Sequence, residues 1–183
     1  MTTTAVIIIA ALIVGAIAAW FFFRQQRSKK LRSQFGPEYE NAVHKYGTSP
    51  KAEDALVARQ RRIDKLHIHS LPPDERDRFA NQWHELQSRF VDDPAGSIEK
   101  ADQLVCDVMS ARGYPMSEFE VRADDLSVDH TQVVRNYRAA HAITLRREGG
   151  ETSTENLRQA LVYYRDLFDE LLEAHVAEKG TTR

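Results

Sequence analysis

Hydrophobic and polar positions follow two patterns along this chain. The 22 residues from Thr2 to Phe23 carry no charge and are mostly apolar. A helix of that length extends about 33 Å at roughly 1.5 Å per residue, enough to cross a hydrocarbon layer about 30 Å thick. Beyond residue 35, apolar residues recur every three or four positions among charged ones, which is typical of amphipathic helices. No sustained alternation of period two indicates a strand. The pattern predicts an all-α protein with an N-terminal transmembrane helix.

Prolines, glycines and capping residues divide the rest of the chain into helices. Pro37 and Gly47 bound the first segment, with proline at the start and glycine just past the end. Ser49 is the expected cap of the second helix and Asp93 that of the fourth. Thr152 begins a capping-box pattern ahead of the last helix. The pattern predicts an antiparallel bundle of five to six helices joined by short loops.

An aromatic stripe marks the expected centre of the bundle. Phe79, Trp83, Leu86 and Phe90 follow one another at spacings of four, three and four. Such a stripe is more often core than a cofactor site. Cys106 lies beside the apolar face of the following helix, where we expect a buried, unreactive thiol. It is the only cysteine, so the chain cannot form an internal disulfide, which suits a reducing compartment.

The residues that follow the apolar segment indicate its orientation. Trp20 and the three phenylalanines after it would lie in an aromatic belt at the membrane interface. A basic juxtamembrane segment, residues 24–34, comes next and holds Arg24, Arg27, Lys29, Lys30 and Arg32. Positive residues flanking a span favour the cytoplasmic side. We therefore expect a single-pass protein of the cell membrane, with its N-terminus outside and its C-terminal domain in the cytoplasm.

A cleaved secretory signal is the alternative to this anchor. Its support is an A-x-A pattern at Ala16–Ala18. The residues before Ala5 include no Lys or Arg, however, and the apolar run is long for a signal sequence. The five basic residues after the run would also resist translocation. The anchor is the favoured interpretation.

The domain beyond the basic segment is acidic. Setting aside the five basic residues leaves 20 of the 25 Lys and Arg against 27 Asp and Glu, a net charge of −7 with neutral histidines. Nucleic acid requires a basic face, so this charge argues against it as a partner. The lipid bilayer is an expected partner. Each basic residue near an anionic leaflet could contribute about 1 kcal/mol of attraction, but setting the orientation of the anchor is the main role expected of the basic segment.

One acidic stretch, RADDLSVDHTQVV from Arg122 to Val134, raises the question of chemistry. Asp124, Asp125 and His130 could bind a divalent metal or a partner, and they are weak candidates for a metal site. Asp129 fits better as the N-cap of the next helix, with Gln132 three positions later completing a capping-box variant. Charged clusters of this kind more often mark solvated helix ends.

Other candidate chemistry is weaker still. His67 and His69 form an H-x-H pair, but no further metal ligand follows at a suitable spacing. The chain contains no nucleophile motif, phosphate-binding loop or carboxylate–histidine motif of di-metal bundles. Arg59–Arg62 resembles a basic patch, but neighbouring acids favour a solvated helix face. We therefore expect no catalytic residues and no cofactor.

Several segments resemble one uncharacterised family of bacterial single-pass membrane proteins with a helical soluble domain. They are FGPEYENAV, FVDDP, ARGYP, DDLSVDH and STENLRQALVYYRDLFDELL, which together extend from about Phe35 to Leu172. The resemblance implies a bacterial, membrane-anchored helical domain. It implies no activity, cofactor or partner, and it supplies no catalytic residues.

These observations predict four regions: a transmembrane anchor (1–23), the basic juxtamembrane segment (24–34), a cytoplasmic α-helical domain (35–178) and a disordered tail (179–183). The expected function is protein interaction or scaffolding, with another protein or a second copy as partner, and not catalysis. The connector from Gly113 to His130 is the surface expected to matter most. The alternative is a ligand- or metal-binding bundle built around Asp124, Asp125 and His130. An enzyme would fall within this alternative.

Overall fold

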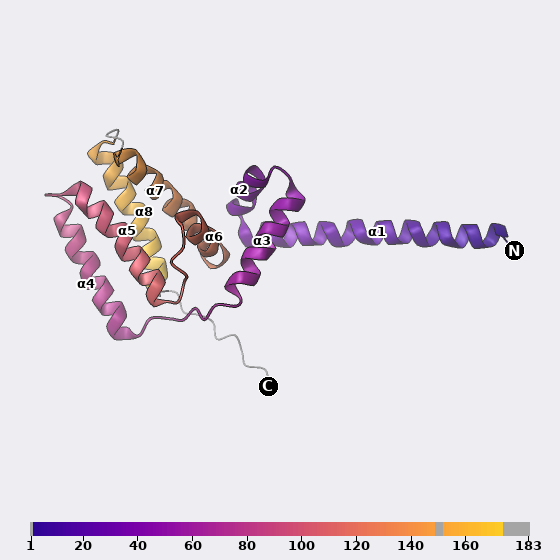
Figure 1. Ribbon diagram of the computed structural model, residues 1–183, viewed down its shortest axis with the longest axis horizontal. Helices are drawn as coiled ribbons and strands as arrows, with labels where there is room; N and C mark the ends of the chain where they lie inside the picture. Colours follow the sequence, from indigo (N-terminus) through magenta and orange to yellow (C-terminus); the bar gives the residue numbers. More distant parts are fainter. Residues whose placement is uncertain (1, 149–151, 174–183) are drawn as a thin grey trace. The chain divides into compact units, whose positions relative to one another are not determined.

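The computed structural model describes residues 2–148 and 152–173, without the side chains of residues 2–7, 9–11, 147 and 148. Within these ranges the protein is all-α, as predicted. It has eight helices and no strand (Figure 1). The helices are α1 (Thr2–Phe35), α2 (Pro37–Tyr46), α3 (Ser49–Ile63), α4 (Pro73–Arg89), α5 (Pro94–Ala111), α6 (Phe119–Asp129), α7 (Val134–Glu148) and α8 (Thr154–Glu173). The predicted tail, 179–183, lies outside the described residues.

The helices after α1 outnumber the predicted five to six, since the described chain forms seven from α2 to α8. The difference comes from α6, an 11-residue helix within the connector, where the sequence indicates a short helix at most. The chain divides into two compact units within α3, the first ending at Val57 and the second beginning at Ala58.

Helix α1 is the longest element of the first unit and continues without interruption through the basic segment to Phe35. This continuity is expected, because no proline or glycine occurs between Trp20 and Gly36. Gly36 ends the helix with a positive φ of 46°. Pro37 and Gly47 then bound α2 as predicted, and Gly47 adopts a left-handed conformation with φ of 77°.

The apolar segment of α1 has exposed side chains. From Leu12 to Phe23, the large apolar side chains that the structure describes are 51–70% exposed, so the chain itself does not bury them. Within the part of the chain that the structure describes, no helix is both long and apolar enough to cross a membrane. Of the predicted anchor, 1–23, the structure does not describe Met1 or the side chains of residues 2–7 and 9–11.

The C-terminal half of α1 packs into the first unit around one buried carboxylate. Glu53 of α3 accepts hydrogen bonds from Ser28 of α1 and from the Tyr39 hydroxyl of α2, the latter at 2.9 Å. The buried apolar residues of the unit surround this junction: Leu31, Phe35, Tyr39, Ala42, Ala52 and Leu56. A buried carboxylate with two donors is satisfied, and so it fixes the three helices against one another.

The second unit is a helical bundle built on α4, α5, α7 and α8. Helix α8 packs against both α5 and α7, and α4 packs against α5. The pairs α4–α5 and α7–α8 each run in opposite directions (Figure 1). Trp83 of α4 stacks on Phe168 of α8 with ring centroids 4.6 Å apart. The predicted aromatic stripe is confirmed at Phe79, Trp83 and Leu86, whereas Phe90 is half-buried just beyond the end of α4.

Helix starts agree with the sequence in part. Asp93 caps α5 as predicted, accepting the Gly96 N–H at 2.9 Å. At α8 the capping side chain is Ser153 and not Thr152, because the Ser153 hydroxyl accepts the Asn156 N–H at 3.2 Å. Ser49 is the first residue of α3 and not its cap, since the Ala52 N–H already bonds to the carbonyl of Thr48.

Gly113, just past the end of α5, marks a close approach between two segments. Its φ is 93°, and a Cβ built there would lie 2.6 Å from the carbonyl oxygen of His67. Glycine meets both demands at once, because it tolerates positive φ and has no Cβ.

We expect Gly113→Ala to lower the free energy of unfolding of the second unit by about 2–4 kcal/mol, through left-handed strain and a backbone collision. Urea unfolding measures the loss. The matched control is Gly47→Ala, where φ is also positive but no atom lies within 4 Å of a built Cβ. Equal losses for the two variants would contradict the role of the close approach.

Candidate functional site

The acidic stretch singled out by the sequence lies on α6, and its helix boundary differs from the prediction. Asp129 is the last residue of α6 and not the N-cap of α7, so the predicted capping box with Gln132 is wrong. The His130 carbonyl, and not a side chain, accepts the N–H groups of Val133 and Val134 at 3.3 Å and 3.2 Å. Helix α6 extends this far because Leu126 and Val128 are buried in the core.

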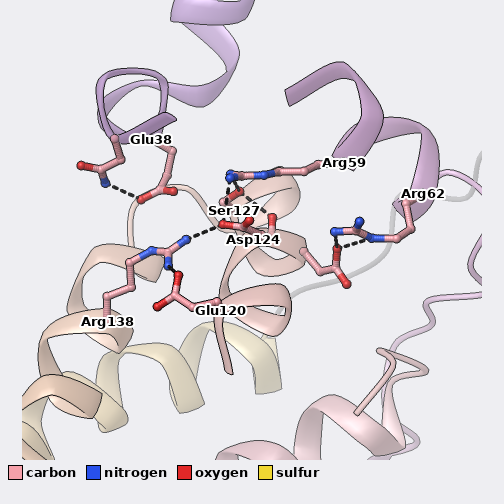
Figure 2. A network of polar contacts seen from close by, with 9 residues as sticks. Glu38, Arg59, Arg62, Glu120, Asp124, Ser127 and Arg138 are labelled. Atoms are coloured by element: carbon pink, nitrogen blue, oxygen red, sulfur yellow. Dashed lines mark hydrogen bonds and ion pairs between the residues drawn. The ribbon is translucent and has the colours of Figure 1, made fainter. Parts of the chain in front are cut away.

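Asp124 lies at the centre of a network of arginines (Figure 2). It is 8% exposed, and its carboxylate accepts from Arg59 of α3 and from Arg138 of α7, each at 2.8 Å. Arg138 also binds Glu120, one turn earlier on α6, at 2.9 Å. The carboxylate therefore joins three helices through charge-assisted hydrogen bonds.

Ser127 completes the contact on the side of Arg59. Its hydroxyl accepts from Arg59 Nη1 at 3.3 Å and donates to the carbonyl of Asp124 at 2.6 Å. Arg59 is 4% exposed and Ser127 is fully buried. The guanidinium is thus held from two sides by residues of a single helical turn.

Asp125 faces a different arginine. Its Oδ1 accepts from both Nε and Nη2 of Arg62, with the Nε bond at 2.7 Å. Burial raises the pKa of Asp125, and the bonds from Arg62 oppose that rise. Arg62 remains partly exposed, with 45% of its side chain accessible, while the Asp125 side chain is 1% accessible. The sequence prediction of a solvated Arg59–Arg62 face is therefore wrong for Arg59 and incomplete for Arg62.

The described contacts of this α6 network pair arginines with carboxylates. Three guanidiniums, of Arg59, Arg62 and Arg138, face the carboxylates of Glu120, Asp124 and Asp125. A divalent cation at Asp124 or Asp125 would have to displace arginines that stay protonated in proteins. Among the described residues, no three metal-ligating side chains are grouped. The arrangement is suited to holding helices together.

His130, the third candidate residue, lies in a second polar cluster. It is 5% exposed, and its Nδ1 lies 3.2 Å from Glu170 Oε1 of α8. Burial lowers the pKa of His130, the hydrogen bond to Glu170 opposes this, and the charge of Arg112 lowers it further. The other ring nitrogen, Nε2, is buried with no hydrogen-bond partner among the described residues. The structure gives His130 a partner separate from the arginines that bind Asp124 and Asp125.

Arg112 is a buried residue that the sequence interpretation missed. It is 2% exposed and donates to the carbonyl of Leu171 at 2.7 Å and to that of His69 at 3.3 Å. It therefore ties the end of α8 to the segment that precedes α4. His69 takes part through its backbone carbonyl, and its imidazole is not involved in this contact.

A positional signal for the missed arginines is present in the sequence. Arg59 lies between Leu56 and Ile63 at spacings of three and four, on the apolar stripe of α3. Arg112 likewise follows Val108 and Met109 on the apolar stripe of α5. A charged residue on an apolar stripe is rarely buried without a partner.

Two further features, a cysteine and a surface groove, are poor candidates for a reactive or ligand-binding site. Cys106 is half-buried, where a fully buried thiol is expected; burial and then Asp102 raise its pKa, which favours the unreactive thiol form. A shallow groove of about 240 Å³ lies between α4 and α5, with Leu86 and Leu104 among mixed charges that include Glu85, Arg89, Lys100 and Asp107. The mixture of charges selects no particular ligand class.

The predicted interaction connector, Gly113–His130, is mostly buried in its second half and mixes buried, half-buried and exposed positions in its first half. Tyr114 is 3% exposed, and every residue from Ala123 to Val128 is buried. Met116 and Val121 are its large exposed apolar residues. Only the second half of this segment is therefore part of the core.

No model of a known protein family matches the chain, and comparisons with curated proteins and with solved structures find no significant match.

We expect Asp124→Leu to lower the free energy of unfolding by about 3–5 kcal/mol, because it leaves Arg59 buried without its carboxylate. The double variant Arg59→Met/Asp124→Leu is expected to recover most of that loss, since no unpaired charge remains. Denaturant unfolding of the single and double variants measures the coupling. Arg158→Gln, which breaks an exposed pair with Glu155, is the control and should change little. Additive losses in the double variant would contradict the pairing.

The stability of the second unit is expected to fall as the pH drops below about 6.5, the ordinary value for histidine. Because burial lowers the pKa of His130 in the folded state, the unfolded chain binds the proton first, and acid then favours unfolding. The loss is complete below the lowered folded pKa. His130→Gln should flatten this part of the profile, whereas His84→Gln, at an exposed position of α4, should not. An unchanged profile in His130→Gln would refute the assignment.

Proposed function

We propose that this protein is a single-pass membrane protein whose helical domain acts as an interaction or scaffolding module on the inner face of the membrane. The observation that carries the proposal is the uncharged run from Thr2 to Phe23, whose large described side chains are exposed. An exposed apolar surface of that extent requires an apolar environment or a partner. The basic segment that follows favours a cytoplasmic domain.

The first unit supports a mechanical role for α1. The same helix that carries the apolar run continues into the core of the unit, where Ser28 and Tyr39 bind the buried Glu53. The first unit, joined to its anchor by a continuous, packed helix, is held close to that anchor, unlike a unit on a flexible linker. This is the arrangement expected of a protein that presents a binding surface at a membrane.

The interaction role is supported by what the polar residues of the second unit do. The buried aspartates bind arginines, the buried histidine faces Glu170, and Arg112 binds backbone carbonyls. These contacts account for the candidate residues as supports of the fold. An acidic helical domain of this kind fits a protein partner, or a second copy of the chain, better than nucleic acid.

The test is membrane retention of the full chain carrying a C-terminal reporter. We expect the wild-type chain to resist alkaline extraction and the reporter to lie on the cytoplasmic side. Val14→Asp should weaken retention, because a charge at the centre of a span costs about 3 kcal/mol. Ser33→Asp adds the same charge beyond the apolar run and should be retained.

Two results would contradict the proposal. A mature N-terminus just after Ala18 would establish a cleaved signal in place of an anchor. Cross-linking in the same membranes tests the interaction role, and a chain found there only as a monomer without a cross-linked protein partner would count against it.

A further inference from the structure

Three cations follow the exposed aromatic residues along one side of α1. Arg24, Arg27 and Lys30 are spaced three residues apart, so their side chains are neighbours on the helix surface. Trp20 to Phe23 lie immediately before them and are 55–70% exposed. Arg24 lies over the Trp20 ring, 5.2 Å from its centroid. An apolar aromatic surface bordered by cations matches the boundary between acyl chains and anionic headgroups.

The rise of the helix places these cations at the depth of the headgroups. If Phe23 marks the edge of the hydrocarbon, Arg27 lies about 6 Å and Lys30 about 10 Å beyond it, at roughly 1.5 Å per residue. The headgroup layer on each side is roughly 5–8 Å thick. The long side chains of Arg and Lys can reach back toward the interface. A phosphate in this layer is thus within reach of all three.

One of the three cations, Arg27, already binds a carboxylate of the chain. Arg27 Nη2 lies 2.7 Å from Asp54 Oδ1 of α3, and both side chains are well exposed, at 46% and 74%. An exposed ion pair contributes little in water. A lipid phosphate presents the same kind of acceptor to the same guanidinium. Asp54 and a headgroup therefore compete for Arg27.

The remaining basic residues of the segment are placed differently. Arg32 lies over the Tyr39 ring, 4.8 Å from its centroid, so it packs against its own chain. Lys29 is two positions from Arg27 and faces another side of α1. Because Lys29 and Arg32 are placed differently from Arg24, Arg27 and Lys30, a site on one side of α1 can be distinguished from charge spread evenly around the helix.

We propose that Arg24, Arg27 and Lys30 form a binding site for the phosphate headgroup of an anionic lipid, and that Asp54 is a built-in competitor for Arg27. The inference rests on the proposed membrane anchor. Anionic lipid would release Asp54 from Arg27, so the lipid composition of the leaflet would act on the contact between α1 and α3.

The experiment uses the full chain in vesicles containing brominated phosphatidylglycerol or brominated phosphatidylcholine at equal mole fractions. Quenching of Trp20 fluorescence reports which lipid lies next to the site. Trp83 is buried in the second unit, and a Trp20→Phe variant gives its background. The measured quantity is the ratio of quenching by the anionic lipid to quenching by the neutral lipid.

We expect a ratio above one for the wild-type chain. Arg27→Gln should lower it by about two- to fivefold, and Asp54→Asn should raise it by a similar factor, the range expected for one exposed ionic contact. Lys29→Gln removes the same charge from another side of α1, and Glu40→Gln removes one acid from α2. Both controls should change the ratio less than the corresponding test variant.

The outcomes separate this inference from the proposed function. A chain that floats with both kinds of vesicle but shows a ratio of one overturns the headgroup site and leaves the anchor standing. Equal effects of Arg27→Gln and Lys29→Gln, or of Asp54→Asn and Glu40→Gln, also overturn it in favour of unspecific attraction. A chain that floats with neither kind of vesicle overturns both proposals.

Discussion

The burial of Arg59 against Asp124 is the constraint on which the arrangement around α6 depends. A guanidinium that is 4% exposed is tolerable in a protein interior only where an anion and further acceptors surround it. Residues of one helical turn, Asp124 and Ser127, meet this need together. The start, rotation and register of α6 are therefore fixed by the polar contacts of Arg59 as well as by the burial of Leu126 and Val128. A slip of one residue would bury the arginine without its partner.

The same requirement recurs with different chemistry elsewhere in the molecule. Arg112 is compensated by two backbone carbonyls and not by a carboxylate, and Glu53 is compensated by two hydroxyl groups. In each case one buried polar group gathers ligands from separate segments of the chain. Apolar packing alone would allow the helices of such a bundle to rotate or slide with little loss, whereas satisfied polar contacts select one arrangement.

The all-α class, most helix boundaries and the core stripe of α4 could be predicted, because periodicity and capping are local properties. The full extent of α6 is harder to predict, because burial of Leu126 and contacts with α3 and α7 stabilise it. The predicted role of Asp129 is wrong for the same reason: a capping pattern competes with tertiary packing, and packing extends α6 as far as Asp129. Arg59 and Arg62, the α3 partners of Asp124 and Asp125, lie more than 60 residues before them in the chain, a separation that spacing rules do not reach.

The uninterrupted course of α1 also imposes a phase relation between the apolar run and the packed face of the first unit. Each residue of an α-helix advances about 1.5 Å and turns about 100°. The number of residues between Phe23 and Leu31 therefore sets the direction in which the packed face points relative to the aromatic end of the run. Adding or removing a single residue there would keep composition and charge almost unchanged, yet would turn the face by more than a quarter of a revolution. Length in this stretch is thus itself a structural variable, as strict as the identity of any side chain within it.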